Sequence, residues 1–310
     1  MIKNFFLFLL IFILIPIGVK GAVLYLEPAE GEYQPSDTFM VDVRIDTEGE
    51  CINTVKADLN FSQDLLKAVD FSQGDSILTL WVEGPKIDQG AGLISFTGGI
   101  PGGYCGRIPG DPGASNLLGN IIFKTQETRN EQQAKVEFLD SSQVLLNDGL
   151  GTPAKLTTRG ANFTILAEKL EEVPKDEWQE ELEKDKIPPE TFVIEVRQDP
   201  AVFEGKYFLI FSTTDKQTGL DYFEIKEGEK DWKKGESPYL LEDQSLQSII
   251  KVKAVDKAGN EIIALLEPLR ASKNPIGGVW FLGIVLGAIG VIIWGIIKRF
   301  KVQGTRCKGL

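Results

Sequence analysis

Apolar and polar residues alternate in short runs through the first half of the chain. In "TFMVDVRID" the side chains of Phe39, Val41, Val43 and Ile45 fall on one face, and polar side chains dominate the other. A period of two residues predicts a β-strand with one buried face. Similar runs, separated by Gly, Asn, Asp and Pro, occupy residues 23–26, 55–61, 77–82, 93–98, 117–123, 134–138, 143–146 and 161–165. Nine closely spaced strands within residues 22–166 predict a β-sandwich.

The alternation stops in residues 167–189, which are dense in Glu and Lys and are bounded by prolines. Opposite charges three and four residues apart predict a solvated helix within residues 175–184. We interpret this stretch as an acidic linker, and a functional acidic tract is the alternative.

Strand patterns return in residues 190–270, in "TFVIEVRQ", "KYFLIFST", "LDYFEIKE", "SIIKVKAVD" and "EIIALLE". Their number and length predict a smaller, immunoglobulin-like β-sandwich. The turn "DKAGNE" joins the last two runs, and we expect Gly259 and Asn260 to supply the positive φ that such a turn needs.

Two long apolar segments flank these modules. Residues 5–19 are apolar and follow Lys3, and small residues at Val19 and Gly21 suit a cleavage site, which predicts a secretory signal over residues 1–21. An uncleaved N-terminal anchor is the alternative interpretation.

The second segment, residues 276–297, is 22 residues without a charge. At about 1.5 Å per residue a helix of this length spans a hydrocarbon core of about 30 Å. We predict a transmembrane helix over residues 275–297, with the basic tail, residues 298–310, in the cytoplasm by the positive-inside rule. A buried core helix is the alternative, and Gly283 and Gly287 could bring two such helices together.

Charge and cysteine content fit an extracellular location. Residues 22–275 hold all 45 acids but only 26 of the 33 Lys and Arg, a net charge of −19, which disfavours nucleic acid as a partner. Cys51 and Cys105 are the only cysteines between the apolar ends. An even pair in an oxidising compartment predicts a disulfide, with two buried thiols as the alternative.

Little in the sequence points to catalysis. Histidine is absent from all 310 residues, which removes the usual general base and the usual zinc ligand. No nucleophile elbow, phosphate loop or dinucleotide fingerprint is present. We therefore expect no enzyme, although a pair of carboxylates of the glycosidase type stays open among 45 acids.

Two glycine-rich stretches are candidate loops. In "NDGLGT" we expect a turn at Asn147 and Gly149, and Asp148 is a weak candidate calcium ligand, because the alternating acids of a calcium loop are missing. Residues 96–113 hold seven glycines and three prolines and predict a long loop, which Cys105 would tether as a binding rim or an ordered connection.

Exposed aromatic side chains are what a sugar-binding surface needs. Trp81, Tyr104 and Trp232 are the candidates for such a ligand face, and burial in a core is the alternative for each. Asn60 and Asn162 satisfy the glycosylation rule but fall in predicted strands.

The first module resembles cohesin domains. The resemblance lies in the ordered series "GEYQPSDTFMVDV", "NTVKADLNFSQDLLKAVDF", "GLISFTGGIPGG", "LLGNIIFKT" and "VLLNDGLGT". It implies a jelly-roll sandwich that binds a calcium-loaded dockerin module through one sheet face. The glycine-rich insert with Cys105 and the paired Cys51 depart from the family pattern. The second module resembles the immunoglobulin-like or fibronectin-like stalks of bacterial surface proteins, which implies a spacer.

Together these patterns predict a single-pass cell-membrane protein that displays a cohesin-like binding module to the outside. We expect it to capture a dockerin-type or other surface protein, with calcium as a possible cofactor and the lipid bilayer holding the C-terminal helix. Direct binding of a polysaccharide, linked to polysaccharide breakdown, is the alternative function.

Overall fold

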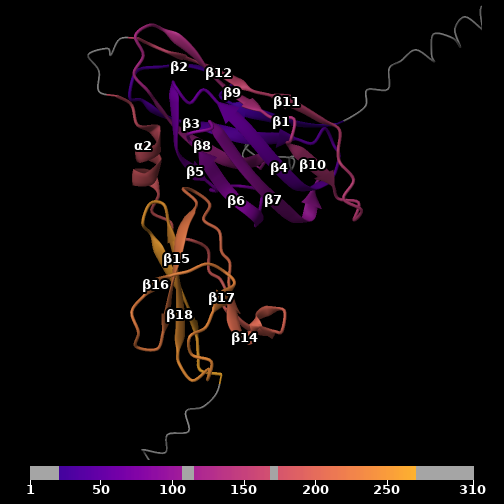
Figure 1. The fold of residues 1–310 in the computed structure, drawn as a ribbon, viewed down its shortest axis with the longest axis vertical. Coiled ribbons are helices and arrows are strands. Elements are labelled where there is room, and N and C mark those ends of the chain that lie inside the picture. Colours follow the sequence, from indigo (N-terminus) through magenta and orange to yellow (C-terminus); the bar gives the residue numbers. More distant parts are fainter. Residues whose placement is uncertain (1–20, 107–114, 168–173, 270–310) are drawn as a thin grey trace, which may run out of the picture.

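The computed structural model describes residues 21–106, 115–167 and 174–269. Two β-modules lie end to end, with helix α2 beside the larger one (Figure 1). The predicted signal peptide, transmembrane helix and basic tail lie outside the described residues, apart from Gly21. Within the residues described, no helix has the length and apolar character needed to cross a membrane.

The first module is a β-sandwich of two sheets with the strand orders β11-β1-β3-β8-β5 and β2-β12-β9-β4-β7-β6, and β10 pairs with β4. The twelve strands are β1 (Ala22–Glu27), β2 (Glu30–Tyr33), β3 (Thr38–Asp46), β4 (Ile52–Phe61), β5 (Leu66–Ser72), β6 (Leu80–Asp88), β7 (Leu93–Tyr104), β8 (Leu117–Thr125), β9 (Gln132–Phe138), β10 (Gln143–Leu146), β11 (Leu156–Arg159) and β12 (Ala161–Ile165).

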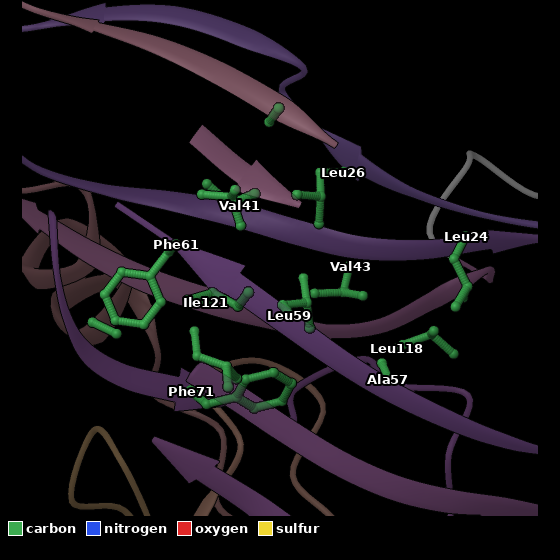
Figure 2. Close-up of a cluster of buried hydrophobic side chains, with 14 of the residues drawn as sticks. Leu24, Leu26, Val41, Val43, Ala57, Leu59, Phe61, Phe71, Leu118 and Ile121 are labelled. Carbon is green, nitrogen blue, oxygen red and sulfur yellow. The ribbon is translucent and has the colours of Figure 1, made fainter. Parts of the chain in front are cut away.

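The core of this module forms where the inner faces of the two sheets meet. Phe39, Val41, Val43 and Ile45 of β3 are fully buried, as their alternation predicts. Figure 2 shows side chains of both sheets, such as Val43 and Leu59, turned toward one another. A sandwich buries every second residue of each strand in this way.

The chain passes from one sheet to the other at two places on one side of the sandwich. β1 belongs to the first sheet and β2 to the second, and Gly160 likewise separates β11 from β12. β11 runs parallel to β1 and β12 runs parallel to β2. These crossings add hydrogen-bonded strands at the edge of each sheet.

Nine strands were predicted here, and the structure has twelve. The sequence analysis missed β2, β5 and β11. Two of these, β2 and β11, bury few side chains and are defined by backbone pairing with their neighbours. The run at residues 77–82 is shifted, since the strand is β6 (Leu80–Asp88). The glycine-rich stretch from residue 96 is strand as far as Tyr104, and residues 107–114 lie outside the described parts.

The second module packs two small sheets, with the orders β13-β14-β17 and β16-β15-β18-β19. The strands are β13 (Glu195–Asp199), β14 (Val202–Ile210), β15 (Leu220–Glu227), β16 (Lys233–Lys234), β17 (Tyr239–Leu240), β18 (Ile250–Asp256) and β19 (Glu261–Leu266). Leu209, Phe211 and Val252 belong to its buried core. In the turn between β18 and β19, only Gly259 has a positive φ, so the expectation for Asn260 was wrong.

The segment between the modules is held against the first module. Helix α2 (Glu177–Lys184) begins after Asp176, whose side chain accepts a hydrogen bond from the amide of Gln179. The Lys175 amide donates to Asp37, and the Met40 amide donates to Glu177. The described part of the expected linker is therefore docked rather than free in solvent.

Candidate binding face

Strands β10, β4, β7 and β6 present one side of their sheet to solvent. Val55, Ala57 and Leu59 of β4 point into the core, so the alternating Lys56 and Asp58 point outward. The same rule turns the alternate residues of β7 outward. We call the outward side of these four strands the outer face; its side chains come from Thr54, Lys56, Asp58, Leu80, Glu83, Lys86, Ser95, Thr97, Gln143 and Leu145.

Strand register arranges these side chains in rows across the outer face. Lys56 lies opposite Gln143 on one side and Thr97 on the other, and Thr97 lies opposite Glu83. A second row runs from Asp58 through Ser95 to Lys86. Each row therefore carries a lysine and an acid, with small residues on the central strand β7.

The third row is the apolar one. Leu145 lies opposite Thr54, Thr54 lies opposite Gly99, and Gly99 lies opposite Leu80. Leu80 is 55% exposed, and its neighbour Val82 on the edge strand is 65% exposed. Small residues therefore occupy the middle strand of this face, between two rows that carry charges and a third row that ends in leucines.

Electrostatic contacts on the outer face are local. Lys56 and Asp58, two residues apart on β4, form an ion pair of 3.0 Å between Nζ and Oδ2. The Ser142 hydroxyl accepts from the Asp58 amide at 3.1 Å and donates to the Asp58 carbonyl. Such contacts order the side chains of the surface, and the mixture of charged, small and apolar residues suits docking of a partner surface.

The opposite sheet offers less free surface. Helix α2 contacts β3, and the second module contacts β5 through the Lys257 ammonium, 2.7 Å from Asp70, and through the Ser72 hydroxyl, which donates to the Thr218 carbonyl. Figure 1 shows α2 and the second module on the β5 side of the sandwich. The outer face borders the second module at its Leu80 end, where Leu80, Ile210 and Phe211 line a cavity of about 700 Å³. Among the described residues, the other side chains of this face form no hydrogen bond or ion pair with α2 or the second module.

The predicted turn residues lie just beyond β10. Gly149 has a φ of 74°, so it adopts the left-handed conformation expected for the turn. Asn147 does not have a positive φ. Asn147 instead fastens the turn to neighbouring strands, because its amide donates to the Cys51 carbonyl and its side chain donates to the Gly102 carbonyl.

Asp148 is exposed and accepts a hydrogen bond from the Leu150 amide at 2.8 Å. Hydrogen bonds from the Thr152 side chain and the Leu150 amide hold the pKa of Asp148 below its usual value. Across the described residues, Asp148 does not join other acidic side chains in a group that could hold a metal. The structure thus gives Asp148 a role in the turn, and its candidacy as a calcium ligand stays a prediction.

A disulfide joins Cys51 and Cys105, with an S–S distance of 2.04 Å. It links the residue before β4 to the residue after β7, at the same end of the sheet as the Asn147 turn. Both cysteines are exposed, so the bond closes the border of the outer face rather than filling the core.

The three candidate aromatic residues do not form a common surface. The ring of Trp81 lies 5.8 Å from that of Phe96, and Trp81 and Tyr104 both pack against the first core. Trp232 belongs to the second module, where Lys253 lies 4.7 Å above its ring. Phe203 is the one exposed aromatic side chain among the residues described.

Sequence reasoning did not single out the residues of the outer face. The signal was present, since the alternation in β4 and β7 separates inward from outward residues. The register between strands was missing, and only register shows which polar side chains become neighbours.

Comparison with known proteins gives structural neighbours for about half of the chain. No family model matches, and no curated protein matches. The cohesin of a cohesin–dockerin complex from Clostridium thermocellum has 10% identity, covers 47% of this chain and 94% of its own, and has a TM-score of 0.39. The sixth cohesin of scaffoldin B from Acetivibrio cellulolyticus, solved in complex with a dockerin, has 16% identity, covers 48% and 99%, and has a TM-score of 0.37. A cohesin module of a Clostridium perfringens glycoside hydrolase has 8% identity, covers 48% and 97%, and has a TM-score of 0.33. With identities and TM-scores this low, the comparison describes a similarity of fold and does not identify a ligand.

Proposed function

We propose that the chain is a binding protein of the cell surface, whose first module captures a protein partner on the outer face. The observation that supports it most is the contrast between the two sheets: linker and second module pack against one, while the other presents rows of charged, small and apolar side chains to solvent. Docking between proteins uses such mixed surfaces.

The partner that the sequence resemblance suggests is a dockerin-type module. In this proposal the second module and the docked linker hold the outer face away from the membrane, and residues 275–297 anchor the chain. The chain itself contributes binding and no catalysis. The polysaccharide alternative lacks support in the described residues, because no row of exposed aromatic rings is present there.

The first test is a substitution in the middle of the outer face. Thr97→Arg places a long charged side chain on the central strand, opposite Lys56 and Glu83. We expect it to weaken capture of calcium-loaded dockerin modules by the full-length protein by about thirtyfold or more, the effect of losing roughly 2 kcal/mol at the centre of an interface.

The matched control is Thr157→Arg, on the exposed strand β11 at the edge of the other sheet. It should leave capture unchanged. Surface plasmon resonance against a panel of dockerin modules, beside a glycan array with and without calcium, gives the measurement. Retention of glycans alone, or equal binding by both variants, would refute the proposal.

A further inference from the structure

Three aspartates lie close together at the end of the second module that contacts the first module. Asp185 follows helix α2, Asp215 lies between β14 and β15, and Asp256 ends β18. They are 1%, 4% and 1% exposed, and one carboxylate oxygen from each lies within 4.8 Å of the others. Three separate segments of the chain therefore bring negative charges together out of solvent.

No cation in the described parts of the chain forms an ion pair with these carboxylates. Lys257, which follows Asp256, pairs with Asp70 at 2.7 Å, and Lys216, which follows Asp215, pairs with Glu190 at 2.6 Å. Buried charges are normally paired or bound to a metal, because their desolvation is costly. Beside Asp185, Lys184 pairs with Glu181 at 2.9 Å and Lys186 is exposed to solvent. None of these four lysines pairs with the cluster, which therefore lacks its counter-charge.

Hydrogen bonds satisfy most of the cluster and leave one oxygen without a donor. Asp185 accepts from Ile187 and Thr218, and Asp256 accepts twice from Asn260, so all four of their oxygens are used. Both hydrogen bonds to Asp215, from the amides of Gln217 and Gly219, go to Oδ1. Among the residues described, Oδ2 of Asp215 accepts no hydrogen bond. Asp215 is 4% exposed and lines a cavity of about 700 Å³ between the modules, which leaves this residue open to a small ion.

The pKa of Asp215 agrees with an uncompensated site. Burial raises it, the two amide hydrogen bonds lower it, and the charges of Asp185 and Asp256 raise it further. A positive ion between the carboxylates would remove the repulsion and give the free oxygen a partner.

We propose that Asp185, Asp215 and Asp256 bind a divalent cation of the calcium type. The ligand atoms are all carboxylate oxygens, which hard cations prefer, and the cluster contains no nitrogen or sulfur donor. Calcium binds oxygens at about 2.3–2.6 Å in flexible geometry, whereas magnesium demands a near-ideal octahedron at about 2.0–2.1 Å. Oxygens spread up to 4.8 Å apart fit around calcium more readily.

The position of the cluster gives the ion a structural task. The loop of Asp215 also carries Thr218, whose carbonyl accepts from Ser72 of the first module, and the turn of Asp256 carries Lys257, which pairs with Asp70. An ion here joins the linker to both of these loops. It therefore fixes the end of the linker beside the contact between modules, and this holds whatever the first module binds.

The test compares unfolding of the purified full-length chain in a chelator and in Ca²⁺, together with calorimetric titration of CaCl₂. We expect one ion bound and a rise in unfolding temperature with Ca²⁺, with a smaller rise in Mg²⁺. Asp215→Asn should abolish the rise. In the chelator this variant should be at least as stable as the unmodified chain, because it removes a repelling charge.

Asp231→Asn, which removes an exposed carboxylate of the same module, is the matched control and should keep the full rise. Asp148→Asn separates the cluster from the turn in the first module. The proposal fails if Ca²⁺ gives no rise, if Asp215→Asn keeps it, or if Asp148→Asn alone abolishes it.

Limited trypsin digestion of the unmodified chain decides the matter even if Asp215→Asn does not fold. Lys184 and Lys186 flank Asp185 and are exposed. Ca²⁺ should slow cleavage at these two sites relative to the chelator. Equal cleavage rates in both conditions would overturn the proposal.

Discussion

Single exposed residues set part of the acid response of the second module. Glu242 accepts hydrogen bonds from the ammonium groups of Lys230 and Lys233. These hydrogen bonds, with the two positive charges, lower the pKa of Glu242 from its usual 4.5 to about 2. The folded state therefore favours the ionised carboxylate, and its stabilisation is present above pH 4.5 and disappears as the pH falls toward about 2.

Glu242→Gln should remove this pH-dependent stabilisation. We expect a lower unfolding temperature near neutral pH and a shallower decline between pH 4.5 and about 2 than in the unmodified chain. The difference should shrink in high salt, which screens exposed charges. Thermal melts across this pH range measure it, with Glu229→Gln as the exposed control. Parallel curves for the unmodified and Glu242→Gln chains would contradict the assignment.

Glycines within strands show how tightly the sheets of the first module pack. A Cβ on Gly98 of β7 would lie 2.7 Å from Leu78, and one on Gly119 of β8 would lie 2.4 Å from Phe71. Glycine is required at these positions because any larger side chain would collide with the large residues that pack against the strand. Gly98 belongs to the stretch expected to be a loop, and close packing explains its glycine instead.

Pairs of elements are joined by covalent and backbone contacts at the border of the outer face. The disulfide connects the start of β4 to the end of β7, strands that also pair along most of their length. The Asn147 turn attaches to the same two strands. The disulfide and the Asn147 hydrogen bonds therefore fasten the neighbouring ends of β4, β7 and β10 to one another.

The double variant Cys51→Ser, Cys105→Ser tests the disulfide at this scale. The bond spans 54 residues of sequence, and constraining a loop of this size stabilises by roughly 4 kcal/mol in the chain-entropy model. Because both cysteines are exposed, the substitutions cost little packing. Denaturant unfolding should show this loss, and reduction of the unmodified chain should reproduce it. A loss well under 1 kcal/mol would show that the bond does not limit the unfolded chain.

The whole molecule depends on a close approach of two backbones between the modules. A Cβ on Gly74 would lie 2.0 Å from the Gln217 carbonyl oxygen, and one on Gly219 would lie 2.9 Å from the Gly74 amide nitrogen. The Ser72–Thr218 hydrogen bond and the Asp70–Lys257 ion pair lie beside this contact. The modules are thus set against each other by backbone fit as well as by charge.

Gly74→Ala should push the modules apart while leaving each core intact. Small-angle scattering should report a larger radius of gyration, and the contact between modules should weaken by about 1–3 kcal/mol, the usual cost of overpacking. Gly84→Ala is the control, because nothing lies within 4 Å of its added Cβ. Identical scattering from the two variants would mean that the junction tolerates the methyl group.

The sequence by itself determined the β-rich character of both modules, many of their strands and the short helix. Alternation is enough for β3 and β15 because a strand with one buried face must repeat every two residues. It could not find β2 or β11, which exist because a neighbouring strand offers backbone partners. Nor could it gather Asp185, Asp215 and Asp256, or the rows of the outer face. Those neighbours come from the way distant segments pack and from the register of paired strands, and only the tertiary structure decides them.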